Sequence, residues 1–187
     1  MPIKGQGWEF HIIRKEEQES PSDERRTVGT YKVYHDGVRK IGSDFSGMVA
    51  ESEGPGANAP EGNGKRVEAG RYPMATQDGT AFKTFGYVEN DDPNDFPQPG
   101  LELTDTGDRT EILIHPGQGF LFSVGCINPC TNLPNANEPI DYVGSRRRVL
   151  AIIADMKTFL GADFPMTNGK QIPKAFVVID GEPPPVF

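Results

Sequence analysis

Cysteine is scarce in this sequence, since only two of its 187 residues are cysteines. They are Cys126 and Cys130, and one pair at this spacing does not make a disulfide framework. A bridge between them would close only a short loop. It would act as a redox switch rather than as a structural cross-link.

The sequence also lacks an apolar run long enough to cross a bilayer, so we expect no membrane span. Basic residues are too few to balance the acidic ones: 19 Lys and Arg face 27 Asp and Glu, for a formal net charge of −8. This balance argues against a nucleic-acid partner or binding to an anionic membrane. No secretory signal is recognisable, because residues 1–10 contain no basic stretch followed by an apolar one.

Strong helix signals are few, whereas glycine and proline are abundant, with 22 Gly and 17 Pro. This composition predicts a mainly β fold, a β-rich α+β domain with long connections. No repeat or linker divides the chain, and its length suits one core, so we expect a single domain over residues 1–187.

Alternating apolar residues predict most of the strands, and two segments without apolar anchors, 53–65 and 90–100, predict flexible loops. The expected strands are 8–13, 27–34, 38–41, 47–52, 71–76, 82–88, 101–104, 111–115 and 175–180. The charged run 15–26 predicts an exposed loop. Residues 128–129 and 132–139 are expected to be irregular. One amphipathic helix is expected over 145–160, with its apolar stripe at Val149, Ile152, Ile153, Met156 and Leu160.

The segment 112–128, ILIHPGQGFLFSVGCIN, carries the residues that suggest chemistry. An apolar run leads into His115, and a short loop separates this imidazole from the thiol of Cys126. A histidine that takes the proton of a cysteine makes it a much better nucleophile at neutral pH. The alternative interpretation is that Cys126 is a small buried hydrophobic residue and His115 a core histidine.

This segment resembles the signature of the L,D-transpeptidase (YkuD-like) catalytic domain family. The matching residues are His115, Ser123, Gly125, Cys126, Ile127 and Asn128. A second match is the segment 68–73, EAGRYP, which is similar to a strand that precedes the catalytic half of these domains. Two departures indicate a divergent branch: Val124 replaces the usual second histidine, and the spacer from His115 to Cys126 is short. The resemblance covers about residues 66–130 and implies a mixed-sheet domain with the helix after the catalytic loop.

The resemblance implies a cysteine acyltransferase that acts on the tetrapeptide stems of peptidoglycan, as an L,D-carboxypeptidase, an L,D-transpeptidase or a D-amino-acid exchanger. Cys126 would be the nucleophile and His115 the general base, its tautomer held by a backbone carbonyl in the turn that follows. Backbone N–H groups of Gly125 and Cys126, with Ser123, would bind the oxyanion. Asn128 would order the loop or contact the donor stem. No cofactor or metal is implied.

Three arginines at the start of the expected helix, Arg146, Arg147 and Arg148, oppose the helix dipole there. They are candidates for binding the carboxylates of the substrate, with a solvated charge run as the alternative.

A wall substrate places the activity in the periplasm or cell envelope of a target cell, and the protein in the cytoplasm before export. Without a recognisable signal, the sequence fits an antibacterial effector delivered by a secretion apparatus, with a component of that apparatus or an immunity protein as partner.

Two other classes of function remain open. His115, Cys126 and Cys130 would be the ligands of a zinc-dependent hydrolase, although the cysteine spacing is not that of a common zinc motif. Alternatively, the domain is a non-catalytic wall-binding module of a phage tail or secretion apparatus, which the missing second histidine favours.

Overall fold

The computed structural model describes residues 3–186, so Met1, Pro2 and Phe187 lie outside the described part. The fold is mostly β, with 36% strand and 14% helix in one mixed-sheet domain, which confirms the predicted fold class. The strands are β1 (Trp8–Glu19), β2 (Arg25–His35), β3 (Val38–Arg39), β4 (Ser46–Ser52), β5 (Gly70–Thr76), β6 (Phe82–Lys83), β7 (Gln98–Pro99), β8 (Leu101–Leu103), β9 (Ile112–Ile114), β10 (Asn128–Cys130) and β11 (Gln171–Asp180). The helices are α1 (Tyr142–Leu160) and two short 3₁₀ turns, η1 (Ser43–Phe45) and η2 (Gly161–Asp163).

The main sheet follows the order β10-β4-β2-β1-β11-β5-β8-β9, with β3 added to β2. Neighbouring strands are antiparallel except β1 and β11, which pair in parallel and make the sheet mixed. Ile114 and Ile127 form a further parallel bridge, so the segment that enters β10 also contacts β9. This contact joins the two ends of the sheet and brings the residues after β9 next to those before β10.

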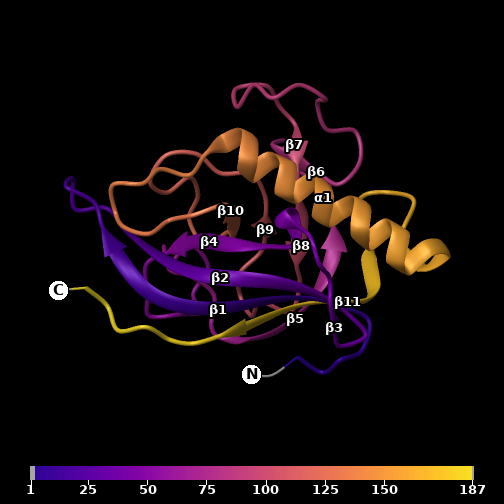
Figure 1. The fold of residues 1–187 in the computed structure, drawn as a ribbon, viewed down its shortest axis with the longest axis horizontal. Coiled ribbons are helices and arrows are strands. Elements are labelled where there is room, and N and C mark those ends of the chain that lie inside the picture. Colours follow the sequence, from indigo (N-terminus) through magenta and orange to yellow (C-terminus); the bar gives the residue numbers. More distant parts are fainter. Residues whose placement is uncertain (1–2, 187) are drawn as a thin grey trace.

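The core forms because apolar residues alternate along the central strands. Trp8, Phe10 and Ile12 of β1 are fully buried on one face, as their spacing predicts. Figure 1 shows α1 crossing the strands on one side of the sheet. The helix contributes four of the five predicted stripe residues to the core as buried side chains, Val149, Ile152, Ile153 and Met156, and Leu160 packs there partly buried.

The helix begins three residues earlier than predicted, because Asp141 caps it by accepting a hydrogen bond from the N–H of Gly144 (2.9 Å). Arg146, Arg147 and Arg148 therefore lie beyond the first turn, and the expected conflict with the helix dipole is smaller than the sequence suggested. The helix ends at Gly161, where φ is 55° and the N–H bonds to the carbonyl of Lys157.

Two predictions of irregular structure were wrong. The charged run after residue 15 continues β1 to Glu19, and β2 begins at Arg25. Its charged side chains are compatible with a strand because one of them, Glu17, is buried in an ion pair with Arg66. Residues 128–130 form β10 against β4 instead of a loop. In contrast, the expected strand 82–88 is reduced to Phe82–Lys83, and Gly86 has a positive φ of 78°.

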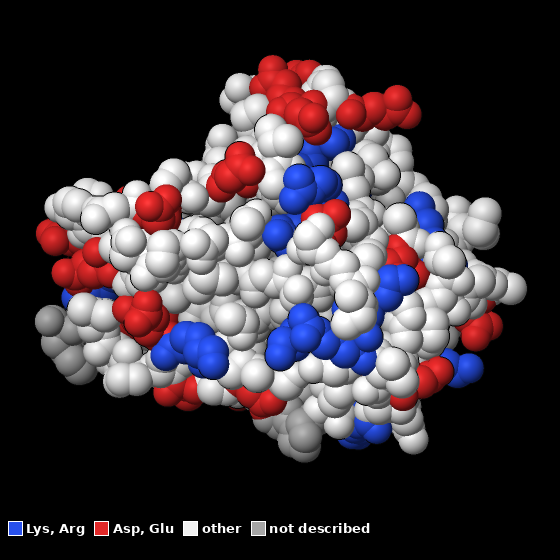
Figure 2. All heavy atoms as spheres, viewed as in Figure 1, with Lys and Arg blue, Asp and Glu red and all other residues white. Residues whose placement is uncertain are grey.

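The two long loops have no regular secondary structure between residues 53 and 65, and little between 90 and 100. The second loop projects above α1, where Figure 2 shows acidic side chains gathered. Glu89, Asp91, Asp92 and Asp95 are exposed there. Within residues 3–186, none of the helices has the length and apolar character that a membrane crossing requires.

Candidate functional site

The bridge between Ile114 and Ile127 brings the predicted nucleophile and base together. Ile127 donates a backbone hydrogen bond to Leu113 (2.8 Å), and His115 donates one to Ile127 (3.2 Å). His115 directly follows β9, and Cys126 directly precedes Ile127 on the neighbouring segment. Backbone pairing therefore sets the separation of imidazole and thiol, although the two residues are joined by a loop.

Cys126 is 8% exposed, and its thiol has two backbone contacts. The sulfur accepts from the N–H of Leu113 (3.3 Å) and faces the carbonyl of Glu111 as a donor (3.5 Å). Burial raises the pKa of the Cys126 thiol, and the N–H of Leu113, the Ser123 hydroxyl and the Arg109 charge oppose this rise. The thiol in the free protein is therefore protonated at neutral pH.

His115 is held in one tautomer. Its Nδ1 lies 2.7 Å from the carbonyl oxygen of Pro116, and a carbonyl can only accept, so Nδ1 carries the proton. This is the backbone carbonyl after His115 that the sequence predicted for this role. The lone pair of Nε2 then points at the hydroxyl of Ser123, 3.2 Å away.

The His115 imidazole is 1% exposed and packs between aromatic rings. Its centroid lies 4.1 Å from that of Phe82 and 5.9 Å from that of Phe122. Burial lowers the pKa of His115 to about 4, partly opposed by the Pro116 carbonyl. The imidazole is consequently neutral at neutral pH, which is the form that a general base requires.

These side chains line one pocket of about 220 Å³. The Ser123 hydroxyl contacts His115 Nε2, and Ser123 also lowers the pKa of the Cys126 thiol. The lining residues are Gln77, Gly79, Thr80, Ala81, Phe82, Glu111, Leu113, His115, Ser123 and Cys126. A larger cavity of about 860 Å³ lies elsewhere, around Arg71 and Phe176, and none of its lining residues is a cysteine, serine or histidine.

Gly125 does not serve the role that the sequence predicted for it. Its N–H donates to the hydroxyl of Ser52 (2.6 Å), so it is occupied and does not point at a substrate oxygen. No acceptor within residues 3–186 holds the N–H of Cys126, which leaves that donor for an oxyanion. Gly125 has a φ of 91°, and an added Cβ would lie 1.9 Å from a guanidinium nitrogen of Arg109. The positive φ therefore favours glycine here, and any other residue would also have to displace the Arg109 guanidinium.

Ser52 is a residue of the site that the sequence did not reveal. Besides accepting from Gly125, its hydroxyl donates to the carbonyl of Ser123 (3.3 Å), so it holds both sides of the turn before Cys126. It lies at the end of β4, 71 residues from Ser123 along the chain. No local pattern marks such a partner.

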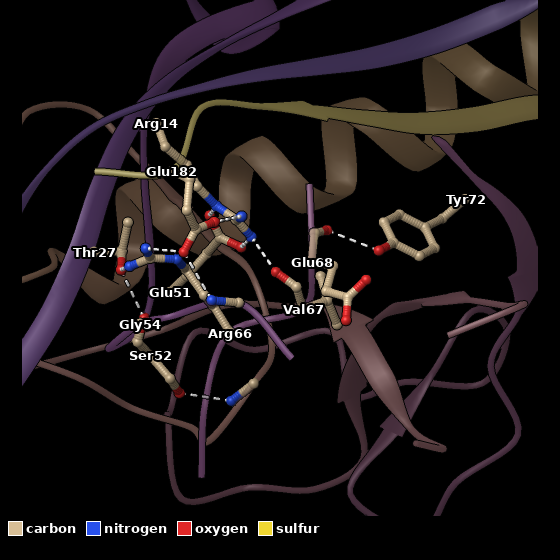
Figure 3. A network of polar contacts seen from close by, with 12 residues as sticks. Arg14, Thr27, Glu51, Ser52, Gly54, Arg66, Val67, Glu68, Tyr72 and Glu182 are labelled. Atoms are coloured by element: carbon tan, nitrogen blue, oxygen red, sulfur yellow. Dashed lines mark hydrogen bonds and ion pairs between the residues drawn. The ribbon is translucent and has the colours of Figure 1, made fainter. Parts of the chain in front are cut away.

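Ser52 is itself supported by a buried network of ion pairs, drawn in Figure 3. The Ser52 carbonyl accepts from the Thr27 hydroxyl (2.8 Å), which also contacts Arg66. Arg66 pairs with Glu17 (2.7 Å) and Glu182 (2.6 Å). The network continues through Arg14, which donates two bonds to Glu51 (2.9 and 2.7 Å). Four segments therefore hold the strand end that positions the loop of the nucleophile: β1, β2, the segment of Arg66 and the segment of Glu182.

Asn128 lies behind His115 rather than in the pocket. It is fully buried, and its Nδ2 donates to the backbone carbonyl of His115 (3.0 Å). Gly117 lies close to it, since a Cβ at this glycine would come within 2.7 Å of the Asn128 side chain. Of the two predicted roles for Asn128, this geometry fits ordering of the loop.

The three helix arginines are not among the residues that line the pocket. Arg146 donates to Asp91 (3.0 Å) and to the Val88 carbonyl, and so anchors the loop above α1. Arg147 pairs with Asp44 (3.0 Å) on the surface. Arg148 donates to the Ser43 and Ser46 carbonyls (2.6 and 2.7 Å). Their bonds account for the arginine run structurally, and the structure does not bring them to the predicted site.

Cys130 is also separated from the pocket. It lies on β10 with its sulfur facing the Met48 carbonyl (3.4 Å), in a small apolar cluster with Val28, Ala50 and Leu133. Both cysteines are free. Only Cys126 lines the pocket, whereas Cys130 is buried on β10. Nowhere in residues 3–186 do three His, Cys, Asp or Glu side chains gather as a metal site would require. The zinc set His115, Cys126 and Cys130 is therefore not assembled.

The fold and this site define a mostly β, mixed-sheet domain with a cysteine, a serine and a histidine in one small pocket. Comparisons with models of protein families, with curated proteins and with solved structures find no match. The resemblance to the L,D-transpeptidases consequently rests on the motif residues themselves.

Proposed function

We propose that this protein is a cysteine acyltransferase that acts on the stem peptides of peptidoglycan, as an L,D-carboxypeptidase, an L,D-transpeptidase or a D-amino-acid exchanger. The observation that carries the proposal is the joint placement of Cys126, Ser123 and a His115 of fixed tautomer in one pocket. The substrate class comes from the motif resemblance.

The reaction begins with transfer of the thiol proton of Cys126 to Nε2 of His115. In this proposal the proton passes through the Ser123 hydroxyl, which contacts Nε2. The thiolate attacks the carbonyl carbon that precedes the terminal D-alanine, and the N–H of Cys126 stabilises the oxyanion.

Collapse of this intermediate breaks the C–N bond, and His115 donates its proton to the leaving amine. A thioester then links the stem to Cys126. Water resolves it to a shortened stem, or an amine resolves it to a new amide, with His115 again taking the proton.

The resting groups are both neutral, because burial raises the pKa of Cys126 and lowers that of His115. Proton transfer is therefore coupled to substrate binding in this proposal, and turnover rises with pH as thiol ionisation becomes easier.

The proposed setting follows from the substrate. Peptidoglycan lies in the cell envelope, so the protein acts there after export from the cytoplasm, as an antibacterial effector in a target cell. An immunity protein or a component of a secretion apparatus is the corresponding protein partner.

The test is incubation with purified muropeptides that carry tetrapeptide stems, followed by mass spectrometry. We expect loss or exchange of the terminal D-alanine, with the glycan and the L-Ala to D-Glu bond intact. Cys126→Ser should remove nearly all turnover, and His115→Ala should lower it by roughly 10²–10⁴-fold, the usual contribution of a general base.

The matched control is Cys130→Ala, which changes the thiol outside the pocket and should keep turnover. EDTA should have no effect. Turnover that survives Cys126→Ser, or that chelation removes, would contradict the thiol mechanism.

A wall-binding module without catalysis is the second candidate, and the burial of the site favours it. Cys126 and His115 are 8% and 1% exposed, and Val124, where the family has its second histidine, is 63% exposed. Under this function, the protein sediments with purified sacculi, Cys126→Ala sediments equally, and no muropeptide changes mass.

A further inference from the structure

Arg109 is a buried cation that has no carboxylate partner. It is 6% exposed, and within residues 3–186 the only hydrogen bond of its guanidinium runs from Nη1 to the Ala57 carbonyl (3.1 Å). Three other buried arginines, Arg14, Arg66 and Arg146, pair with carboxylates. The remaining two, Arg26 and Arg148, have no carboxylate partner, but each guanidinium donates several hydrogen bonds to neutral oxygens. A guanidinium that has lost most of its hydration usually gains an anionic partner in return.

The position of Arg109 links it to the thiol. One guanidinium nitrogen lies close to Gly125, only 1.9 Å from where a Cβ of that residue would be. The charge of Arg109 also favours the thiolate of the next residue, Cys126. Gly125 of the motif therefore lies directly against the Arg109 guanidinium, next to Cys126.

Arg109 lines a second cavity, of about 310 Å³, which shares Glu111 with the first pocket. The loop 53–65 forms one wall of this cavity through Glu61, Gly62 and Gly64. Its charged lining comprises one cation, Arg109, and two exposed carboxylates, Glu61 and Glu111. A ligand that carries one carboxylate and one ammonium group complements this arrangement.

We propose that Arg109 anchors a subsite for the α-carboxylate of an amino acid, in the cavity beside Cys126, with Glu61 and Glu111 on the side of the ammonium group. The role of this subsite rests on the proposed function. The ligand is then either the amino acid released from the stem or the amino acid that accepts the acyl group. Arg109 is then a residue that determines specificity, whereas Cys126, Ser123 and His115 perform the chemistry.

The test compares two alkylating agents of similar size at Cys126. Iodoacetate carries a carboxylate and iodoacetamide does not, so the ratio of their rates measures attraction of an anion to the thiol. Arg109→Gln should lower this ratio by about tenfold, the effect of one charge-assisted hydrogen bond. Arg109→Lys, which retains the charge, should lower it less. Peptide mapping follows Cys126, and Arg147→Gln is the control because that surface arginine lies outside the site.

A second measurement uses the unchanged protein. Free D-alanine should slow the labelling of Cys126 by iodoacetamide, and D-alaninamide should slow it much less. An unchanged ratio in a folded Arg109→Gln variant, or equal protection by the two compounds, would overturn the subsite. Arg109-dependent protection without turnover of any muropeptide would retain the subsite while rejecting the proposed enzyme.

Discussion

At the scale of single residues, burial sets the chemical state of the site. The His115 imidazole is buried against Phe82, and no carboxylate is among its hydrogen-bond partners within residues 3–186, so its charged form is strongly disfavoured. The consequence is a base that is always available at neutral pH but that accepts a proton reluctantly. Because the buried His115 imidazole resists protonation, protonation of His115 favours the unfolded state.

The first prediction concerns the free energy of unfolding as pH falls. His115 has a pKa of about 4 in the folded protein and an ordinary value of 6.5. Between these values the unfolded chain binds a proton that the folded one does not, so stability falls as pH decreases. Between pH 7 and pH 5, the titration of His115 should lower the free energy of unfolding by about 2 kcal/mol.

Urea unfolding of the wild type and of His115→Gln at both pH values checks this expectation. The glutamine variant has no imidazole to titrate, so its free energy of unfolding should fall by about 2 kcal/mol less between the two pH values. All other groups contribute equally to both proteins. Equal losses in the two proteins would show that His115 does not carry a depressed pKa.

At the scale of secondary structure elements, paired charges decide where strands form. The run after residue 15 is highly charged, yet it belongs to β1 because Glu17 meets Arg66 and Arg14 meets Glu51 inside the molecule. Ion pairs of this kind cost desolvation, and removal of one partner leaves an unpaired buried charge.

The second prediction follows from this asymmetry. Arg66→Ala leaves the Glu17 carboxylate, whose side chain is 1% exposed, without its ion-pair partner. We expect a loss of about 3–5 kcal/mol in the free energy of unfolding. The neighbouring Lys65→Ala is the control, because the pair of Lys65 with Glu53 is partly exposed and should contribute no more than about 1 kcal/mol. Denaturant unfolding measures both, and similar small losses would show that the network is not a major source of stability.

At the scale of the whole molecule, one ion-pair network joins segments that are far apart in the chain. Glu182 accepts from Arg66 (2.6 Å) and from the N–H of Gly56 (2.8 Å), so the segment after β11 holds the loop 53–65 in place. That loop also forms a wall of the cavity around Arg109. The conformation of the loop 53–65 at this cavity therefore depends on Glu182, which is far away in the sequence.

The third prediction is that Glu182→Ala loosens this loop. Trypsin should then cleave after Lys65 several-fold faster, because local opening rather than global unfolding exposes the bond. Glu24→Ala, an exposed carboxylate in the turn between β1 and β2, is the control and should not change cleavage. Mass spectrometry of a proteolysis time course measures the rates. A rate for Glu182→Ala equal to that of the wild type would show that the loop is held by other contacts.

Periodicity and turn chemistry were sufficient to predict much of the fold. The alternation of Trp8, Phe10 and Ile12, and the stripe from Val149 to Met156, correctly predicted a buried strand face and a helix face. The pair Asp36-Gly37 is typical of a hairpin turn, and both residues have the positive φ values that the turn between β2 and β3 needs. These features depend on neighbours along the chain, so a single sequence carries them.

The candidate site was predictable in part for the same reason. His115 and Cys126 share one loop, and the carbonyl that orients the imidazole belongs to the very next residue. Ser52 and Arg109 could not be found in this way. Ser52 bonds to Gly125 from 73 residues away, and Arg109 meets it from another loop.

The sequence by itself determined the class of fold, the helix and the set of groups capable of chemistry, because these follow from residue type and short-range spacing. Only the tertiary structure decided what surrounds each group: which N–H is occupied, which arginines have partners and how far the pKa of His115 falls. Burial and ion pairing depend on contacts between distant segments, and the free energies of those contacts have no counterpart in local sequence.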